Sequence, residues 1–316
     1  MTDIPRARAP KAGARTASGE GLGKRLRHAA LGPKPFIVVT LAPAVTILGV
    51  FVYWPIVRSV YMSMFSTRQL AGRMESRFVG TEQYERLFAD ELFHAAIRNT
   101  AFYAVLGTVG CLLLGLGTAL LLVKIGRGRG FYSALMFAPY VVPWAAWTVL
   151  WTWLYDPKFG PANYILGLFG FGQLAWLKSA GLVIPSFVIL SLFKRVGFAA
   201  IIFMVGLQAI SRDLYEAAEI DGAGPVRKLI SISLPQLRPV VVFLGTTFFV
   251  QGLQLFTEPY VMTQGGPGNA STSLVYMLYT RGIQNNNFGY GSALAVVLFI
   301  VVFGISILFR RSNSDA

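Results

Sequence analysis

The amino-acid sequence predicts an all-α integral membrane protein with six transmembrane helices. Of its 316 residues, 54% are hydrophobic and only 13% are charged, and six apolar stretches are long enough to cross a bilayer. A soluble domain carries a charged share of about 25%, and a helix needs roughly 20 apolar residues to span the hydrocarbon core. We therefore expect the lipid bilayer to cover most of the apolar surface.

The six predicted spans follow the apolar runs of the sequence. They cover residues 36–56, 99–123, 131–154, 182–210, 240–262 and 288–309. Several contain proline, which membrane helices tolerate because neighbouring helices satisfy the freed backbone groups. Together they predict a transmembrane domain over residues 36–310, followed by a short cytoplasmic tail, 311–316.

The distribution of positive charge predicts the orientation. Of the 28 Lys and Arg residues, 17 fall in segments on the side of the N-terminus and 9 in segments on the other side. Because Lys and Arg concentrate on the cytoplasmic side of membrane proteins, we expect both termini in the cytoplasm. The net charge of +14 then reflects topology and does not indicate binding of nucleic acid.

Three segments outside the spans have a recognisable composition. Residues 1–35 are rich in Arg, Lys, Ala and Gly, which predicts a disordered basic cytoplasmic tail, and the first span starts too late for a cleaved signal peptide. On the outer side, Thr81 to Ala96 has helical apolar spacing and predicts one amphipathic helix along the membrane surface. Residues 263–287, rich in Gly, Asn and Ser, predict an external loop.

Residues 211–235, between spans four and five, carry the most information. They predict a short helix, a break and a second helix that stops at Pro235. Ser211 is suited to cap the first helix, Gly222 to break it, and Pro225 to open the second. Small residues near the turn would let another protein approach closely.

This segment resembles the EAA loop of the permease subunits of bacterial ABC importers. The match consists of Glu216-Ala217-Ala218, Asp221-Gly222-Ala223, Ile232 and Leu234-Pro235, in the order and spacing of the family. Ser211 stands where the family commonly has proline, and Leu229 where it has phenylalanine. Both positions lie outside the core of the motif, Glu216 to Ala223.

The similarity extends from about Phe36 to the C-terminal arginines. Shorter motifs are like those of the carbohydrate-uptake subgroup, which includes maltose and glycerol-3-phosphate importers. They are Phe78-Val79-Gly80, Asn99-Thr100, Gly206-Leu207-Gln208-Ala209-Ile210, Thr263-Gln264-Gly265-Gly266-Pro267 and Phe288-Gly289-Tyr290-Gly291-Ser292-Ala293.

The resemblance implies a type I ABC importer permease fold in the bacterial cytoplasmic (inner) membrane. In that family the EAA loop docks into a groove of the ATPase. The implied docking residues are Glu216, Ala217, Ala218, Asp221, Gly222 and Ala223. The implied partners are a second, distinct permease, two ATPase subunits that carry ATP and Mg, and an external substrate-binding protein.

The chain itself is not expected to be an enzyme. It has no G-x-x-x-x-G-K-[ST] phosphate loop, so it does not bind ATP by that route. His28 and His94 show no metal-ligand spacing, and the single cysteine, Cys111, lies in an apolar run. We expect no catalytic residues, no metal and no cofactor of its own.

Lys194 and Arg195 lie inside predicted span four, where charges are costly and usually functional. They either line the translocation path or extend to an interface. By resemblance, the path runs through spans four and five. The candidates are Ser191, Lys194, Arg195, Phe198, Phe248, Gln251 and Leu255, with Gln254 added for its polarity. Phe198 and Phe248 also fit plain helix packing.

Trp144, Trp147 and Trp151 are predicted to be interfacial anchors. An ion-gradient-driven secondary transporter is the alternative function, for which Glu258 is the candidate intramembrane carboxylate. Disaccharides, oligosaccharides, polyols and glycerophosphodiesters all remain open as substrates.

Overall fold

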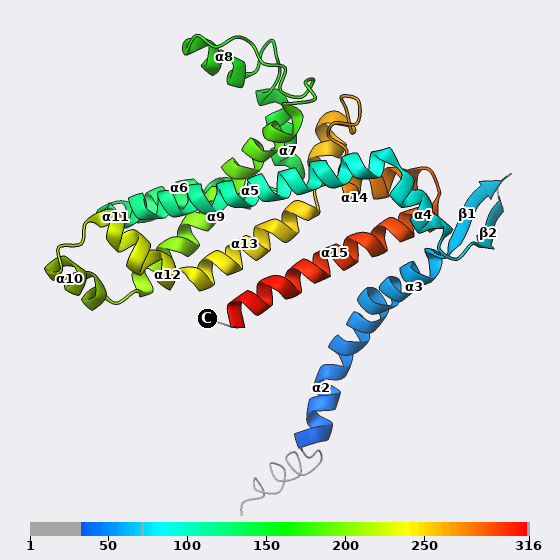
Figure 1. Cartoon of the computed structure of the whole chain (residues 1–316), viewed down its shortest axis with the longest axis horizontal. Coiled ribbons are helices and arrows are strands. Elements are labelled where there is room, and N and C mark those ends of the chain that lie inside the picture. The colour runs from blue at the N-terminus through cyan, green and yellow to red at the C-terminus, as the bar shows by residue number, and fades with distance from the viewer. Residues whose placement is uncertain (1–32, 71–72, 315–316) are drawn as a thin grey trace, which may run out of the picture. The chain divides into compact units, whose positions relative to one another are not determined.

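The computed structural model describes residues 33–70 and 73–314 and is mostly helical (Figure 1). Its contacts define two units, residues 1–57 and 58–316. In the first, α2 (Pro33–Leu48) continues into a π-helical stretch, η1 (Gly49–Tyr53). Within this unit no side chain of residues 37–57 is buried. A helix that is apolar on every face needs lipid or another protein to cover it.

The second unit is built around three packed helices. They are α5 (Glu91–Lys124), α9 (Val183–Ala209) and α13 (Arg238–Leu253). Small residues bring their backbones close together: a Cβ atom added to Gly115 of α5 would lie 2.6 Å from the Cβ of Ala199. A Cβ atom on Gly252 would lie 2.7 Å from the Cα of Ala104. Such contacts are typical of helices that pack within membranes.

Four helices among the described residues are long and apolar enough to cross a membrane. They are Ile37–Met62, Glu91–Lys124, Val183–Ala209 and Phe288–Leu308. Two further helix pairs pass the same test together but are bent. They are α6 (Arg129–Val141) with α7 (Trp144–Leu154), bent by 96°, and residues 225–236 with α13, bent by 68°. The described helices thus provide four spans, or up to six if each bent pair is one span.

The bend between α6 and α7 has a local cause. Val142 precedes Pro143 and adopts an extended conformation, with ψ of 134°, because the proline ring disfavours the helical region for the residue before it. The last carbonyl groups of α6 therefore lack helical partners and need other donors.

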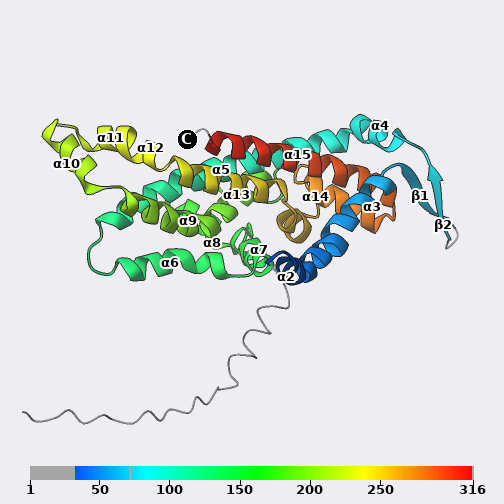
Figure 2. The same cartoon turned by 90° about the horizontal axis from the view of Figure 1, so that it is seen from below.

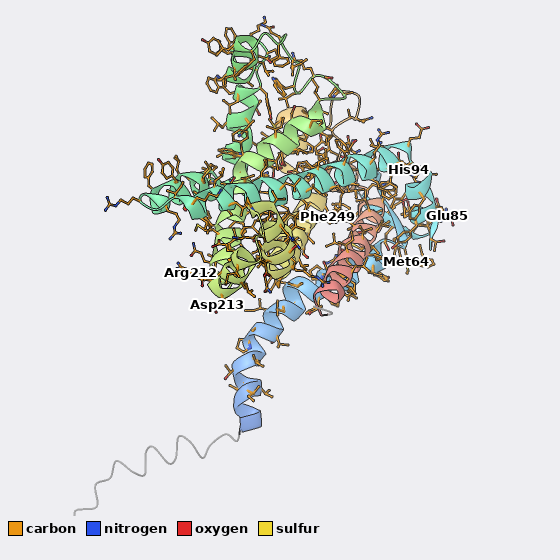
Figure 3. All side chains as sticks on the ribbon, turned by 60° about the vertical axis from the view of Figure 1, so that its left-hand side comes forward. Met64, Glu85, His94, Arg212, Asp213 and Phe249 are labelled. Carbon is orange, nitrogen blue, oxygen red and sulfur yellow. The ribbon has the colours of Figure 1, made fainter. Side chains whose placement is uncertain are left out.

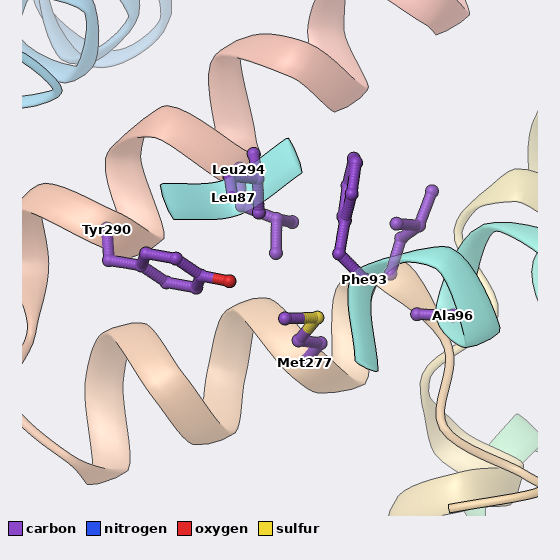
Figure 4. Packing of buried hydrophobic residues seen from close by; sticks show 7 residues of the cluster. Leu87, Phe93, Ala96, Met277, Tyr290 and Leu294 are labelled. Atoms are coloured by element: carbon purple, nitrogen blue, oxygen red, sulfur yellow. The ribbon is translucent and has the colours of Figure 1, made fainter. Parts of the chain in front are cut away.

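The predicted amphipathic helix from Thr81 to Ala96 is not one helix. The structure divides it at Asp90 into α4 (Glu82–Ala89) and the start of α5, where the Asp90 carboxylate accepts a hydrogen bond from the Leu92 N–H at 2.9 Å. Part of its apolar face also packs on protein: Leu87 is fully buried. Figure 4 shows this packing, in which α4 and α5 meet α14 (Leu274–Met277) and α15 (Phe288–Ser314).

The all-α prediction is wrong for one segment. Strands β1 (Phe65–Leu70) and β2 (Arg73–Phe78) form an antiparallel hairpin. Its first pair joins Phe65 to Phe78, whose rings are 5.4 Å apart in an edge-on arrangement. The Gly289 N–H donates to Thr67 Oγ1 at 2.9 Å and ties the hairpin to the start of α15. This long-range support is not visible in the local sequence.

The predicted external loop 263–287 is also partly helical, since α14 and η4 (Leu278–Gln284) occupy its second half and bury Met277. The remaining elements are α3 (Trp54–Met62), α8 (Pro161–Leu168) and η3 (Pro259–Thr263). The predicted N-terminal tail lies outside the described residues up to residue 32, and α15 extends to Ser314, into the predicted C-terminal tail.

Candidate functional site: a polar cavity and an exposed helical segment

A cavity of about 480 Å³ lies in the second unit between α5, α7, α9 and the end of α13. Its lining consists of Tyr103, Tyr140, Val142, Trp144, Lys194, Arg195, Gln251, Gln254, Leu255, Phe256, Thr257 and Glu258. Five of the eight predicted path residues are among them: Lys194, Arg195, Gln251, Gln254 and Leu255. The structure therefore brings together residues from predicted spans four and five around one space.

The other three predicted path residues lie in the packing beside the cavity. Ser191 is fully buried and donates to the Val188 carbonyl at 2.8 Å. Phe198 stacks on Tyr140, with ring centroids 4.6 Å apart, and meets Phe248 edge-on at 6.3 Å. Phe248 is 1% exposed and belongs to the apolar core. In this conformation none of the three lines the cavity.

Lys194 is 3% exposed and reaches across to the end of α6. Its ammonium group donates to the carbonyl oxygens of Pro139 at 2.9 Å and Tyr140 at 3.4 Å, and also to that of Val142. The ring of Trp144 lies 5.3 Å from the same nitrogen. Lys194 thus supplies donors to the carbonyl groups that the bend before Pro143 leaves free.

Arg195 is 4% exposed, and its environment differs from that of Lys194. Its guanidinium carbon lies 4.8 Å from the ring centre of Trp144 and 5.9 Å from that of Phe248. Its Nε atom is buried and has no hydrogen-bond partner among the described residues. Of the two interpretations left open by the sequence, the buried, cavity-lining position is the one observed for both cations.

Tyr103 and Glu258 line the cavity but were not proposed as path residues. The Tyr103 hydroxyl on α5 donates to Glu258 Oε1 at 2.8 Å, and both residues are buried. The sequence does indicate a functional role for Glu258, because carboxylates are rare in apolar stretches. It does not indicate one for Tyr103, since a tyrosine in an apolar helix is equally typical of packing.

The three tryptophans of α7, which the sequence predicts to be interfacial anchors, make contacts within the protein. Trp144 lines the cavity. The Trp147 indole N–H donates to the Leu190 carbonyl of α9 at 3.1 Å, and Trp151 is 7% exposed in a cluster with Tyr155. The bend between α6 and α7 turns these side chains toward α9, which a reading of span three as a straight helix could not anticipate.

The second candidate region is the segment that resembles an EAA loop. It contains α10 (Arg212–Ile220), α11 (Pro225–Lys228), η2 (Leu229–Ser233) and α12 (Leu234–Gln236). The Asp213 N–H donates to Ser211 Oγ at 3.3 Å, so the predicted cap is confirmed. Gly222 has a φ of +70°, which favours glycine at the break, and Pro225 opens α11 as expected.

The surface of α10 is open. Glu216, Ala217, Asp221 and Gly222 are exposed, and Ala218 and Ala223 are half-buried. Ile220, which the sequence reading did not single out, is 88% exposed at the end of the helix.

Two contacts hold α10 against the following segment. Tyr215 and Ser233 share a hydrogen bond of 2.9 Å, and Lys228 pairs with Glu219 at 2.6 Å. The segment is therefore a supported protrusion, not a loose connector.

This segment lies at one end of the second unit, and the β hairpin with α4 lies at the opposite end (Figures 1 and 2). Figure 3 shows the same separation in side chains, with Arg212 and Asp213 far from Glu85 and His94. Among the described residues, no group of three His, Cys, Asp or Glu side chains gathers to hold a metal ion.

Comparison with known proteins identifies the family of this chain. Residues 92–313 match the family described as the binding-protein-dependent transport system inner membrane component. The chain is 32% identical over 281 residues to the sulfoquinovosyl glycerol transport system permease protein of Agrobacterium fabrum, covering 89% of this chain and 91% of that one. It is 31% identical to the trehalose/maltose transport system permease protein of Thermococcus litoralis, covering 91% and 95%.

The fold is that of an ABC importer permease. A chain in the crystal structure of a bacterial alginate ABC transporter, in complex with an alginate pentasaccharide-bound periplasmic protein, superposes with a TM-score of 0.76. The two chains are 19% identical, and the match covers 92% of this chain and 96% of that one. The chain belongs to the binding-protein-dependent transport system inner membrane component family and is an ABC transporter permease of the inner membrane.

Proposed function

We propose that this chain is one of two permease subunits of an ATP-driven importer for sugar-type solutes. In this proposal it spans the membrane six times, each bent pair forms one span, and both termini face the cytoplasm. A second permease, two ATPase subunits and an external binding protein complete the complex. ATP is hydrolysed by the ATPase subunits, and this chain supplies the path and the docking segment.

The observation that carries this proposal is the exposed helix α10 with Glu216 and Ala217 on its open surface. A carboxylate and small side chains on a supported helix suit close docking against a partner with polar groups. One contact holds α10 to α11 and another holds it to η2, so a push on α10 can reach α13 through the chain that follows. ATP-driven closure of the partner subunits would then change access to the cavity.

The sugar-type substrate is supported by the lining of the cavity and by the relatives. Gln251 and Gln254 offer amide groups that bind hydroxyl groups, and Trp144 offers an aromatic face. The related proteins are named for transport of sulfoquinovosyl glycerol and of trehalose and maltose. Lys194, Arg195 and Leu255 complete the part of the predicted path that surrounds this space.

The docking role is tested by Glu216→Lys in the complete importer. We expect the variant to reach the membrane but to lose ATP-dependent uptake, with the ATPase subunits retained poorly on purification. Glu82→Lys is the matched control, because Glu82 is an exposed carboxylate on α4 at the opposite end of the unit. Uptake by the Glu216→Lys variant equal to that of the Glu82→Lys variant would refute the docking role.

The alternative function, a transporter driven by an ion gradient, has one observation in its favour. Glu258 is a buried carboxylate inside the cavity, where a proton or cation could bind. Uptake by the purified chain alone in liposomes, without ATP but with an ion gradient, would favour this function. The proposed importer predicts no uptake in that experiment.

A further inference from the structure

The two adjacent cations of the cavity have different bonding. An ammonium group has three donors, and Lys194 uses them on the carbonyl oxygens of Pro139, Tyr140 and Val142. Lys194 therefore has no donor left for a solute in this conformation. Its position is explained by the bend between α6 and α7.

The Arg195 guanidinium has no comparable partner. It has five donors. Its Nε is buried and has no hydrogen-bond partner among the described residues, and the ion pair found there, between Lys228 and Glu219, does not include it. The rings of Trp144 and Phe248 lie 4.8 and 5.9 Å from its guanidinium carbon, and the Glu258 carboxylate attracts it from beyond ion-pair distance. A buried donor without a hydrogen-bond partner is costly, so this arrangement indicates a group that accepts from Arg195 in another state.

The charge of the lining shows what kind of acceptor fits. The charged residues that line the cavity are Lys194, Arg195 and Glu258, which leaves an excess of one positive charge. Glu258 forms no ion pair with Arg195, and it accepts instead from Tyr103. The planar fork of a guanidinium matches carboxylate, sulfonate and phosphate groups. The ring of Trp144 beside it fixes the position of that fork.

We propose that Arg195 determines specificity and that the solute of this importer carries an acidic group, which Arg195 binds in the cavity. This inference rests on the proposed function and narrows its substrate class from sugar-type solutes to acidic ones. Gln251 and Gln254 bind the hydroxyl groups of the same solute, and Lys194 acts as a positioning residue that holds the wall of the cavity.

The test uses the complete importer in liposomes, with its second permease, ATPase subunits and binding protein. The probe is an equimolar mixture of neutral saccharides and polyols with their uronate, sulfonate and phosphate counterparts, and mass spectrometry measures what accumulates with ATP. Arg195→Gln removes the charge, and Arg195→Lys retains it without the fork. Lys158→Gln is the matched control, because Lys158 is exposed and is not among the residues that line the cavity. Retained ATPase subunits verify the assembly of each variant.

We expect acidic solutes to accumulate in preference to their neutral counterparts. Arg195→Gln should lower kcat/KM for the acidic solute by roughly 10- to 100-fold, mainly through KM, since a hydrogen-bonded charge pair is lost. Arg195→Lys should be intermediate, and Lys158→Gln unchanged.

Three results would overturn the proposal. ATP-dependent accumulation of neutral solutes in preference to acidic ones would refute it alone, with the proposed function intact. An equal loss of acidic and neutral uptake in Arg195→Gln would assign Arg195 a purely structural role. No ATP-dependent accumulation of any solute would refute the proposed function together with this inference.

Discussion

The ammonium nitrogen of Lys194 lies 2.9 Å from the carbonyl oxygen of Pro139, and this contact joins α9 to the last turn of α6. A lysine within an apolar helix would ordinarily suggest an ion path or a solute site. Here the charge is used on backbone groups that a proline-induced bend leaves free. The same bend places Trp144 at the cavity. The wall of the candidate path therefore depends on Lys194, although Lys194 does not itself present donors to a solute.

Lys194→Met should weaken the bend. The carbonyl groups at the end of α6 would lose their donors, at a cost of roughly 1–3 kcal/mol for each group that stays buried. We expect a lower apparent melting temperature and altered tryptophan fluorescence, because Trp144 and Trp147 lie 5.3 and 5.5 Å from the ammonium nitrogen. Lys194→Arg, which keeps charged donors, should retain part of the stability. Unchanged melting and emission in Lys194→Met would contradict this role.

Gly197→Ala should disturb the contact between α9 and α6. A Cβ atom at Gly197 would lie 1.8 Å from the carbonyl oxygen of Met136, a backbone atom that cannot move without moving α6. Overpacking of this kind costs about 1–3 kcal/mol or more, and the apparent melting temperature should fall. Gly117→Ala in α5 is the control, because its new Cβ would meet nothing within 4 Å. Equal melting temperatures for the two variants would show that α6 is not packed on α9 at this point.

The sequence was sufficient to predict the long helices and the segment 211–235, because both depend on local features. Apolar runs of sufficient length define α5, α9 and α15, and Ser211, Gly222 and Pro225 mark the ends and the break of short helices. Five of the eight predicted path residues also meet at one cavity, since they were placed by their register on spans four and five, whose helices both pack on α5.

The remaining features depend on contacts between distant parts of the chain. The hairpin is tied to α15 by the hydrogen bond from Gly289 to Thr67, which are 222 residues apart. The inward position of the α7 tryptophans needs the 96° bend, and Pro143 alone does not specify its angle. The roles of Lys194 and Arg195 differ because the free carbonyl groups at the end of α6 lie across from Lys194 and not from Arg195. No pattern within α9 distinguishes the two residues.

Tyr103 and Glu258 should be energetically coupled. The hydroxyl of Tyr103 donates to the Glu258 carboxylate at 2.8 Å in a buried site, where loss of one partner leaves the other unsatisfied. In a double-mutant cycle of Tyr103→Phe and Glu258→Gln, we expect a coupling free energy of about 0.5–3 kcal/mol in stability. The measurement is thermal or chemical unfolding of the purified complex. Additive effects of the two changes would show that the hydrogen bond contributes nothing.

Ile220→Ser should weaken the association with the ATPase subunits. Ile220 is 88% exposed at the end of α10, beside the acidic and small residues of the docking segment, and an apolar side chain there gains stability only when a partner covers it. Truncation of a buried interface anchor costs roughly 2 kcal/mol or more, so we expect at least a 10-fold weaker affinity for the ATPase in a titration of the purified subunits. Phe159→Ser is the matched control, since Phe159 is 81% exposed but follows α7, outside the docking segment. If the Ile220→Ser variant binds the ATPase as tightly as the Phe159→Ser variant, the end of α10 lies outside the docking surface and the contact is confined to the face around Glu216.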